Sequence, residues 1–393
     1  MAAEAGAAAP DEYLVRAEAL SPRIAAAVPE IERMRRIPAH LLTALHEAGL
    51  YRLLLPRWLS GGEIAPPTFI RLIERIAQAD ASVAWCLCQN NVCAIVAGSL
   101  PPASAREIFA PADAVLAWGP GPARALVTQG GYRLSGNWAF ASGGRQATWL
   151  GAHVAVFEAD GAPRRDEAGT PVIRTLIFPA SAAPMTDIWR VMGLRGTASD
   201  AYEVTDLFVP DAFTLIRDDP AERREQGPLY AMTTGTLFAA GFAGVATGIA
   251  RSLLDALIAL AREKTPRGGR SKLAESALTQ ADIAIAEARL RCARMYLLGT
   301  VDEVWESIQR TNRLSLDDRI AIRLAASQVI HEAVAVADTA YHAAGASAIF
   351  EAGAFERRFR DIHAVAQQVQ GRRAHFETVG KYLLGRDTDL QFV

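Results

Sequence analysis

The chain has 393 residues, of which 51% are hydrophobic and 21% charged, and its formal net charge is −2. This balance is typical of a globular protein with a large core, and it excludes a disordered or fibrous chain. A charge so close to zero gives no electrostatic reason to expect nucleic acid or an anionic membrane as a partner, and we predict neither.

The first segment, as far as about residue 110, has helical periodicity. Pro38 suits the first turn of a helix that Gly49 ends, and Pro66 begins a second apolar-periodic segment. Asp80 follows that segment and is expected to cap the next helix.

The four cysteines are distributed unevenly, with three close together in an apolar, helix-like run: Cys86, Cys88, Cys93 and the remote Cys292. Their spacing fits neither a zinc site nor a disulfide framework, so we predict reduced thiols, no metal and a cytoplasmic protein. Residues 1–10 are Ala-rich without a basic residue and are not expected to be a secretory signal.

Between about residues 115 and 214 the pattern changes to short apolar runs separated by Gly and Pro. Runs such as 149–157 and 172–178 predict strands, and the polar segment 158–170 predicts an exposed loop. A small β-region therefore follows the first helical block.

Long amphipathic segments return after residue 228 and predict four helices with short connections, at 230–263, 278–308, 315–343 and 356–384. Such a set favours an antiparallel bundle. The uncharged stretch 231–250 is long enough to cross a membrane, but Ala, Gly and Thr predominate in it rather than Leu and Ile. It therefore predicts a tightly packed bundle helix.

The common catalytic signatures are absent from the sequence. There is no P-loop and no Gly-x-Ser-x-Gly elbow, and Gly119-Pro120-Gly121 lacks the context of a dinucleotide fingerprint. His331-Glu332 has Ala335 where a metal-binding helix needs a second histidine. If the chain is an enzyme, a bound organic cofactor is the natural carrier of its chemistry.

The segment 138–144, Trp-Ala-Phe-Ala-Ser-Gly-Gly, offers what a planar ring cofactor needs. Alternate residues of a regular strand share a face, so Trp138, Phe140 and Ser142 are expected on one side, as an apolar wall with a hydrogen-bonding group. Gly143 would let the backbone approach the ring. Two rings packed in the core of a β-sandwich are the alternative, and composition alone favours that alternative.

The strand resembles the acyl-CoA dehydrogenase superfamily, together with three further segments: 193–199 (Gly-Leu-Arg-Gly-Thr-Ala-Ser), 360–363 and 374–380. The resemblance covers nearly the whole chain and is strongest to the two-component flavin-dependent monooxygenases. It implies an α+β fold with an N-terminal helical domain, a central β-barrel or sandwich and a C-terminal four-helix bundle, at 1–114, 115–216 and 217–393.

The resemblance also implies roles for particular residues. The flavin ring would be lined by Trp138, Phe140, Ser142 and Gly143, with Ser142 near N5. Thr197 and Ser199 would lie near the flavin or the substrate mouth. Arg267 would reach the phosphate of a flavin in a neighbouring subunit of a homotetramer, and a solvated loop charge is its alternative.

The catalytic base is where the sequence departs from this branch. Many of its members have a histidine in a segment resembling Gln-His-Val-Gln, and here Gln368 takes that place. An amide cannot accept a proton at neutral pH, so we expect Gln368 to orient a substrate that is already nucleophilic. His375, two turns further along the same predicted helix face, is the candidate for a replacement base, and His363 is a second candidate.

The resemblance therefore implies an oxygenase component that receives reduced FMN or FAD from a separate reductase. It would use O2, through a flavin C4a-hydroperoxide, to oxygenate a small organic substrate. The alternatives are an FAD-dependent acyl-CoA dehydrogenase, although 367–373 contains no acid to serve as its base, and a non-catalytic member that binds flavin or a partner.

Overall fold

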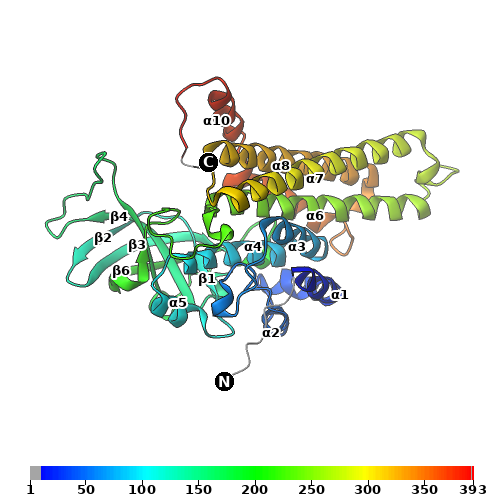
Figure 1. Ribbon diagram of the computed structural model, residues 1–393. Helices are drawn as coiled ribbons and strands as arrows, with labels where there is room; N and C mark the ends of the chain where they lie inside the picture. The colour runs from blue at the N-terminus through cyan, green and yellow to red at the C-terminus, as the bar shows by residue number, and fades with distance from the viewer. Residues whose placement is uncertain (1–9, 391) are drawn as a thin grey trace.

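The computed structural model describes residues 10–390 and 392–393. The expectation about a secretory signal falls mostly on residues 1–9, outside this range. A β-sheet occupies one end of the molecule and helices from both halves of the chain occupy the other (Figure 1).

The N-terminal helices are α1 to α5, at Pro10–Met34, Ala39–Glu47, Pro66–Ala79, Ala81–Ala94 and Pro102–Phe109. The helix boundaries predicted from the sequence are confirmed. Pro38 precedes α2, Pro66 begins α3, and the side chain of Asp80 accepts a hydrogen bond from the Val83 amide at the start of α4. Cys86, Cys88 and Cys93 are buried free thiols, and Cys292 is exposed.

All the strands of the described chain lie between residues 116 and 215. They are β1 to β7, at Leu116–Trp118, Ala123–Thr128, Gly131–Ala141, Trp149–Phe157, Ile173–Pro179, Asp200–Pro210 and Thr214–Leu215. They form one sheet in the order β6-β3-β2-β4-β5-β7, with β1 parallel to β4. Strand β3, which contains the start of the motif segment 138–144, pairs in antiparallel fashion with β6, which directly follows the motif segment 193–199.

The C-terminal helices are α6 to α10, at Thr234–Glu263, Ala277–Thr311, Leu316–Ala344, Glu356–Gln367 and Ala374–Leu383. The first three confirm the predicted long helices. The fourth prediction is wrong, because the expected helix 356–384 is broken into α9, a short 3-10 turn at Val369–Gly371, and α10.

Helix α6 lies at the centre of the helical half and packs against α3, α4, α7 and α8. Its small residues allow this close approach. A Cβ at Gly241 would stand 2.4 Å from the Cys88 sulfur, and one at Gly248 would stand 2.4 Å from the Glu74 carbonyl oxygen. One continuous core therefore joins helices of both chain halves, and the sheet has a separate core.

Three helical stretches of the described chain are long and apolar enough to cross a membrane, judged by length and composition alone: 81–98, 234–263 and 316–349. Their most apolar windows are 94%, 89% and 61% buried within the fold. Their hydrophobicity is therefore used for packing between helices here, most completely in the first two stretches.

Candidate active site

Strand β3 contains a bulge that reverses the expected side-chain alternation. Its pairing with β6 shifts between Trp138 and Ala141, and Phe140 has φ +59°. Trp138 is consequently 1% exposed and Phe140 61% exposed. The prediction that both rings share one face is wrong, because the extra residue of a bulge turns the following side chain to the other side.

Trp138 belongs to the core of the sheet. Its ring stacks on Tyr202 with the centroids 5.1 Å apart. Phe140 instead lies at the surface, where its ring meets the edge of Trp189 with the centroids 5.9 Å apart. Ile188 and Met192, from the same segment as Trp189, are also exposed. The apolar wall open to a planar ligand is therefore formed by Phe140 and this segment.

A chain of buried hydroxyl groups begins directly after β3. The Trp85 indole N–H donates to Ser142 Oγ at 3.0 Å, and Ser142 Oγ lies 2.7 Å from Ser199 Oγ. Ser199 Oγ lies 2.7 Å from Thr197 Oγ1, which donates to the Leu194 carbonyl at 2.9 Å. Ser142, Thr197 and Ser199, which the resemblance places at the flavin or the substrate mouth, thus lie together.

The two ends of this chain fix its direction. An indole N–H can only donate and a carbonyl oxygen can only accept, while each hydroxyl has one hydrogen. Thr197 gives its hydrogen to Leu194, so Ser199 gives its own to Thr197, and Ser142 gives its own to Ser199. Ser142 Oγ is left with a free lone pair and no free hydrogen, so it can accept a further hydrogen bond but not donate one.

Helix α4 supplies residues that the sequence reasoning missed. Trp85 stacks on Phe242 of α6, with centroids 3.8 Å apart. Asn90 donates to the carbonyl oxygens of Leu116 and Ser142, at 3.1 and 3.3 Å. Gly143 has φ +72°, and a Cβ there would stand 2.4 Å from Asn90 Oδ1. Gly143 therefore allows α4 to pack against the end of β3.

Helix α9 holds the turn that carries Thr197. The carboxylate of Asp361 accepts a hydrogen bond from the Leu194 amide at 2.7 Å, and Leu194 has φ +54°. A Cβ at Gly193 would stand 2.2 Å from the Arg360 carbonyl oxygen. The close fit of this turn to α9 explains the glycine at the start of the motif.

A buried ion-pair cluster joins α4, α9 and this turn. Arg357 of α9 lies 2.8 Å from Asp80 and 3.2 Å from Asp361, whose side chains are 1% and 0% exposed. Burial raises the pKa of Asp361 to about 6, and the Arg357 charge opposes that rise. One guanidinium thus links the residue that caps α4 to the residue that holds the 194–199 turn.

The candidate bases do not lie on one helix face, because the helix is interrupted at Gln368. Gln368 is half-buried, and its Oε1 accepts from the Gln370 amide at 2.7 Å. His375 is 4% exposed, and its Nε2 donates to the Val369 carbonyl at 2.6 Å, which leaves Nδ1 as the acceptor. Burial lowers the pKa of His375 and keeps it neutral. His363 binds Asp338 at 2.9 Å.

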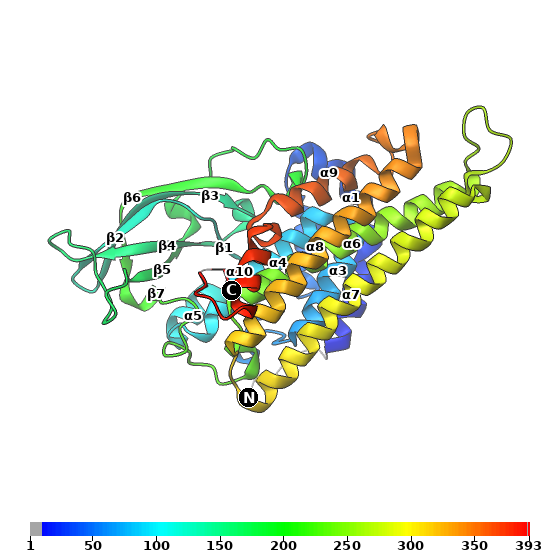
Figure 2. The same ribbon diagram turned by 90° about the horizontal axis from the view of Figure 1, so that it is seen from above.

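Arg267 lies in the connection between α6 and α7, which is exposed and lies at the end of the helices far from the sheet in both views (Figure 2). It is therefore remote from Phe140 and Ser142 of its own chain. Arg195, in contrast, lies near the site and is 3.7 Å from Glu32.

The residues around Phe140 fit a flavin ring. Phe140 exposes an aromatic ring, the buried hydrogen-bond acceptor Ser142 follows it two residues along the chain, and the buried Nε1 of Trp138 has no protein partner among the described residues. No group of three or more His, Cys, Asp or Glu residues in the described chain could hold a metal ion.

Comparison with known proteins finds a family match and several relatives. Residues 240–371 match the family described as acyl-CoA dehydrogenase, C-terminal domain. Indole-3-acetate monooxygenase of Pseudomonas putida is 29% identical over 366 residues, covering 91% of this chain and 90% of the relative. The oxygenase subunit HsaA of Rhodococcus jostii is 26% identical over 371 residues, covering 89% and 92%.

Solved structures agree with this fold. The 3-HSA hydroxylase from Rhodococcus sp. RHA1 has a TM-score of 0.88 at 24% identity, covering 97% of this chain and 99% of that one. XiaF from Streptomyces, solved with FADH2 and glycerol, has a TM-score of 0.88 at 21% identity, covering 97% of each chain. Over about nine tenths of its length the chain is therefore similar to flavin-dependent monooxygenases, and its residues 240–371 match the C-terminal domain of the acyl-CoA dehydrogenases.

Proposed function

We propose that Phe140 and Ser142 form the flavin site of an oxygenase component that acts on a small aromatic compound. The chain is a flavin-dependent monooxygenase that uses reduced flavin, as its relatives named for this activity indicate. Relatives are named as oxygenase components, which implies a separate reductase. Bound reduced flavin supplies the electrons that activate O2.

The observation that carries the proposal is the fixed direction of the hydroxyl chain. In reduced flavin N5 carries a hydrogen, whereas in oxidised flavin N5 has only a lone pair. Ser142 can accept but not donate, so it suits the reduced form. The side chains thus favour a flavin that arrives already reduced, as a separate reductase would deliver it.

The stacked pair Trp85 and Phe242 supports an aromatic substrate. Their rings lie 3.8 Å apart, and Phe238 continues the stack at 5.7 Å from Phe242. Trp85 and Phe242 are only 6% and 1% exposed and Trp85 also donates to Ser142, so the stack would back the site at Ser142 and a flat substrate ring would lie against it, not between its rings. Relatives are named for indole-3-acetate, resorcinol and p-hydroxyphenylacetate, which are all aromatic.

Proton abstraction by a side chain is not part of the proposal. Gln368 cannot take a proton, and His375 already uses Nε2 on a carbonyl while burial lowers its pKa. The substrate is therefore one whose ring is electron-rich without deprotonation. Gln368 would orient that ring, and the Gln368→Ala variant tests this role through turnover and product.

Two finer features belong to the proposal. The chain is divided into an N-terminal helical part, a β-part and a C-terminal bundle near residues 114 and 216. In a homotetramer, Arg267 would serve the flavin of a neighbouring subunit, which its position far from its own sheet favours.

The test is an anaerobic titration of the protein with reduced and with oxidised flavin, both as FMN and as FAD. The reduced form should bind more tightly. In Ser199→Ala the hydroxyl hydrogen of Ser142 loses its acceptor, so Ser142 can also donate to oxidised flavin. The ratio of the dissociation constants of oxidised and reduced flavin should therefore fall by about tenfold, which is the effect of one hydrogen bond to a buried group. Trp85→Phe is the matched control, because it removes a donor without changing the direction of the chain. Absence of flavin binding in both redox states would refute the proposal.

A further inference from the structure

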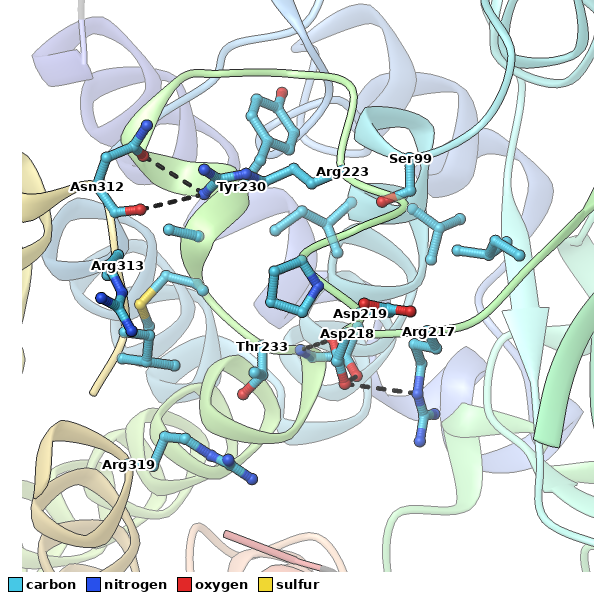
Figure 3. A pocket seen from close by; sticks show the side chains of 18 residues that line it. Ser99, Arg217, Asp218, Asp219, Arg223, Tyr230, Thr233, Asn312, Arg313 and Arg319 are labelled. Carbon is cyan, nitrogen blue, oxygen red and sulfur yellow. Dashed lines mark hydrogen bonds and ion pairs between the residues drawn. The ribbon is translucent and has the colours of Figure 1, made fainter. Parts of the chain in front are cut away.

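A second feature of the fold lies away from the hydroxyl chain. A cavity of about 360 Å³ opens where the ends of α4 and β7 meet the start of α6 and the α7–α8 connection. Its polar lining includes four arginines, Arg217, Arg223, Arg313 and Arg319, which come from the segment before α6 and from the region around the start of α8 (Figure 3). Segments far apart in sequence thus bring cations to one place.

The lining carries an excess of positive charge. Two aspartates, Asp218 and Asp219, face the four arginines, and Arg319 is also bound to an oxygen of Val393, the last residue of the printed sequence, so at least one positive charge of the lining is left in excess. Asp218 is already used: it pairs with Arg217 at 3.6 Å and accepts from the amide and hydroxyl of Thr234 at 2.7 Å each.

The other arginines keep donors available. Among the described residues, the Arg223 guanidinium meets only the carbonyl and amide oxygens of Asn312, at a weak 3.4 Å. Arg313 is exposed at the rim. Arg319 binds the main-chain oxygen of Val393 through Nε and Nη2. A guanidinium has five N–H donors, so each of these can take an additional oxygen ligand.

Helix α6 connects this cavity to the aromatic stack. Thr234 lines the cavity, and Phe238 and Phe242 follow at intervals of four residues, so all three lie along one side of α6. Eight residues of α-helix span about 12 Å. A single-ring or two-ring acid cannot touch both places at once, so the cavity is separate from the stack.

We propose that this cavity is an oxyanion site that captures the carboxylate of an acidic aromatic substrate before its ring reaches the stack of Trp85 and Phe242. The inference rests on the proposed function and adds the substrate class, an aromatic acid. It gives the enzyme a preference for acids over neutral analogues, because arginine binds carboxylates through paired, charge-assisted hydrogen bonds.

The experiment measures binding to the full chain by calorimetry, with indole-3-acetate and its neutral analogue indole-3-acetamide as probes and inorganic phosphate as a competitor. Indole-3-acetate should bind more tightly than the amide. Added salt or phosphate should weaken the binding of the acid and leave the binding of the amide unchanged. The Arg313→Gln/Arg319→Gln variant should bind the acid about tenfold less tightly, since two charged donors are lost, with the amide unchanged.

Two controls keep the result decisive. Arg310→Gln changes an arginine one turn away, outside the lining, and should bind both probes like the wild type. If loss of the Arg319 contact to Val393 unfolds the double variant, Arg313→Glu at the exposed rim takes its place. This variant should reduce the affinity for the acid by at least the tenfold expected of the double variant.

Equal affinity for acid and amide would overturn the proposal. So would phosphate that binds without displacing indole-3-acetate, because the cavity would then hold free oxyanions and not the substrate. Neither outcome changes the result of the flavin titration, so the two proposals can fail separately. If the oxyanion site is wrong, reduced flavin still binds to the protein. If the flavin site is wrong, the protein still binds the acid more tightly than the amide.

Discussion

Arg357→Met tests whether one buried cation holds the reaction site together. The substitution keeps an apolar stem of similar length but leaves the Asp80 and Asp361 carboxylates, 1% and 0% exposed, without their common partner. Removing one member of a buried ion pair costs about 3–5 kcal/mol, because the remaining charge stays desolvated. Two carboxylates share this arginine, so we expect the upper part of that range at pH 7.5.

The loss of stability caused by Arg357→Met should be smaller at acid pH. Burial already raises the pKa of Asp361 to about 6 with Arg357 present, so without the arginine it rises further and the carboxyl takes up a proton in the folded state. Protonation removes the buried charge, and the difference in unfolding free energy between variant and wild type should therefore be smaller at pH 5 than at pH 7.5.

Urea unfolding followed by tryptophan fluorescence measures both effects. Arg358→Met is the matched control, since Arg358 adjoins Arg357 on α9 and its hydrogen bond goes to the Ala354 carbonyl; we expect a loss of about 1 kcal/mol. A second readout is the ratio of oxygenated product to released hydrogen peroxide, which should fall for Arg357→Met because the 194–199 turn is no longer held. An Arg357→Met protein no less stable than Arg358→Met at either pH would refute the reasoning.

Two other substitutions test the site. Asp361→Asn removes a group whose folded pKa lies above its usual value, so wild-type stability relative to this variant should fall by about 2 kcal/mol as pH rises from 4 to 7, and a flat difference would contradict it. Phe140→Ala should weaken binding of reduced flavin about tenfold and leave stability nearly unchanged, while Trp138→Ala should cost about 3–5 kcal/mol of stability; exchanged effects would show that Trp138, and not Phe140, faces the flavin.

Local patterns in the sequence predict the long helices and their ends well. The lengths of α6, α7 and α8 follow from periodicity, and the Asp80 cap follows from residue type. The motifs also identify Ser142, Thr197 and Ser199, which the structure joins in one hydrogen-bonded chain. Local chemistry determines these features, so they are visible in a single sequence.

Features that depend on contacts between distant segments are not visible in this way. The bulge at Phe140 depends on the register against β6, and an alternating pattern gives no sign of it. The break at Gln368 occurs where Gln370 turns to meet Arg323 of α8. Trp85 sits in a helix that is buried on almost every side, so its single donor cannot be told from ordinary core packing without the position of Ser142.

Helix α4, with the residues that flank it, contacts the ion-pair cluster, the hydroxyl chain and the arginine-lined cavity, so its position constrains all three. Asp80 fixes its start to Arg357, Trp85 orients Ser142, and Asn90 binds the ends of β1 and β3. Ile95, directly after its last residue, reaches the arginine-lined cavity. A rigid helix sets these four places at fixed intervals of 1.5 Å per residue. A change that tilts α4 should therefore alter flavin preference, coupling to product and selectivity for acids together, whereas the single substitutions above alter them one at a time.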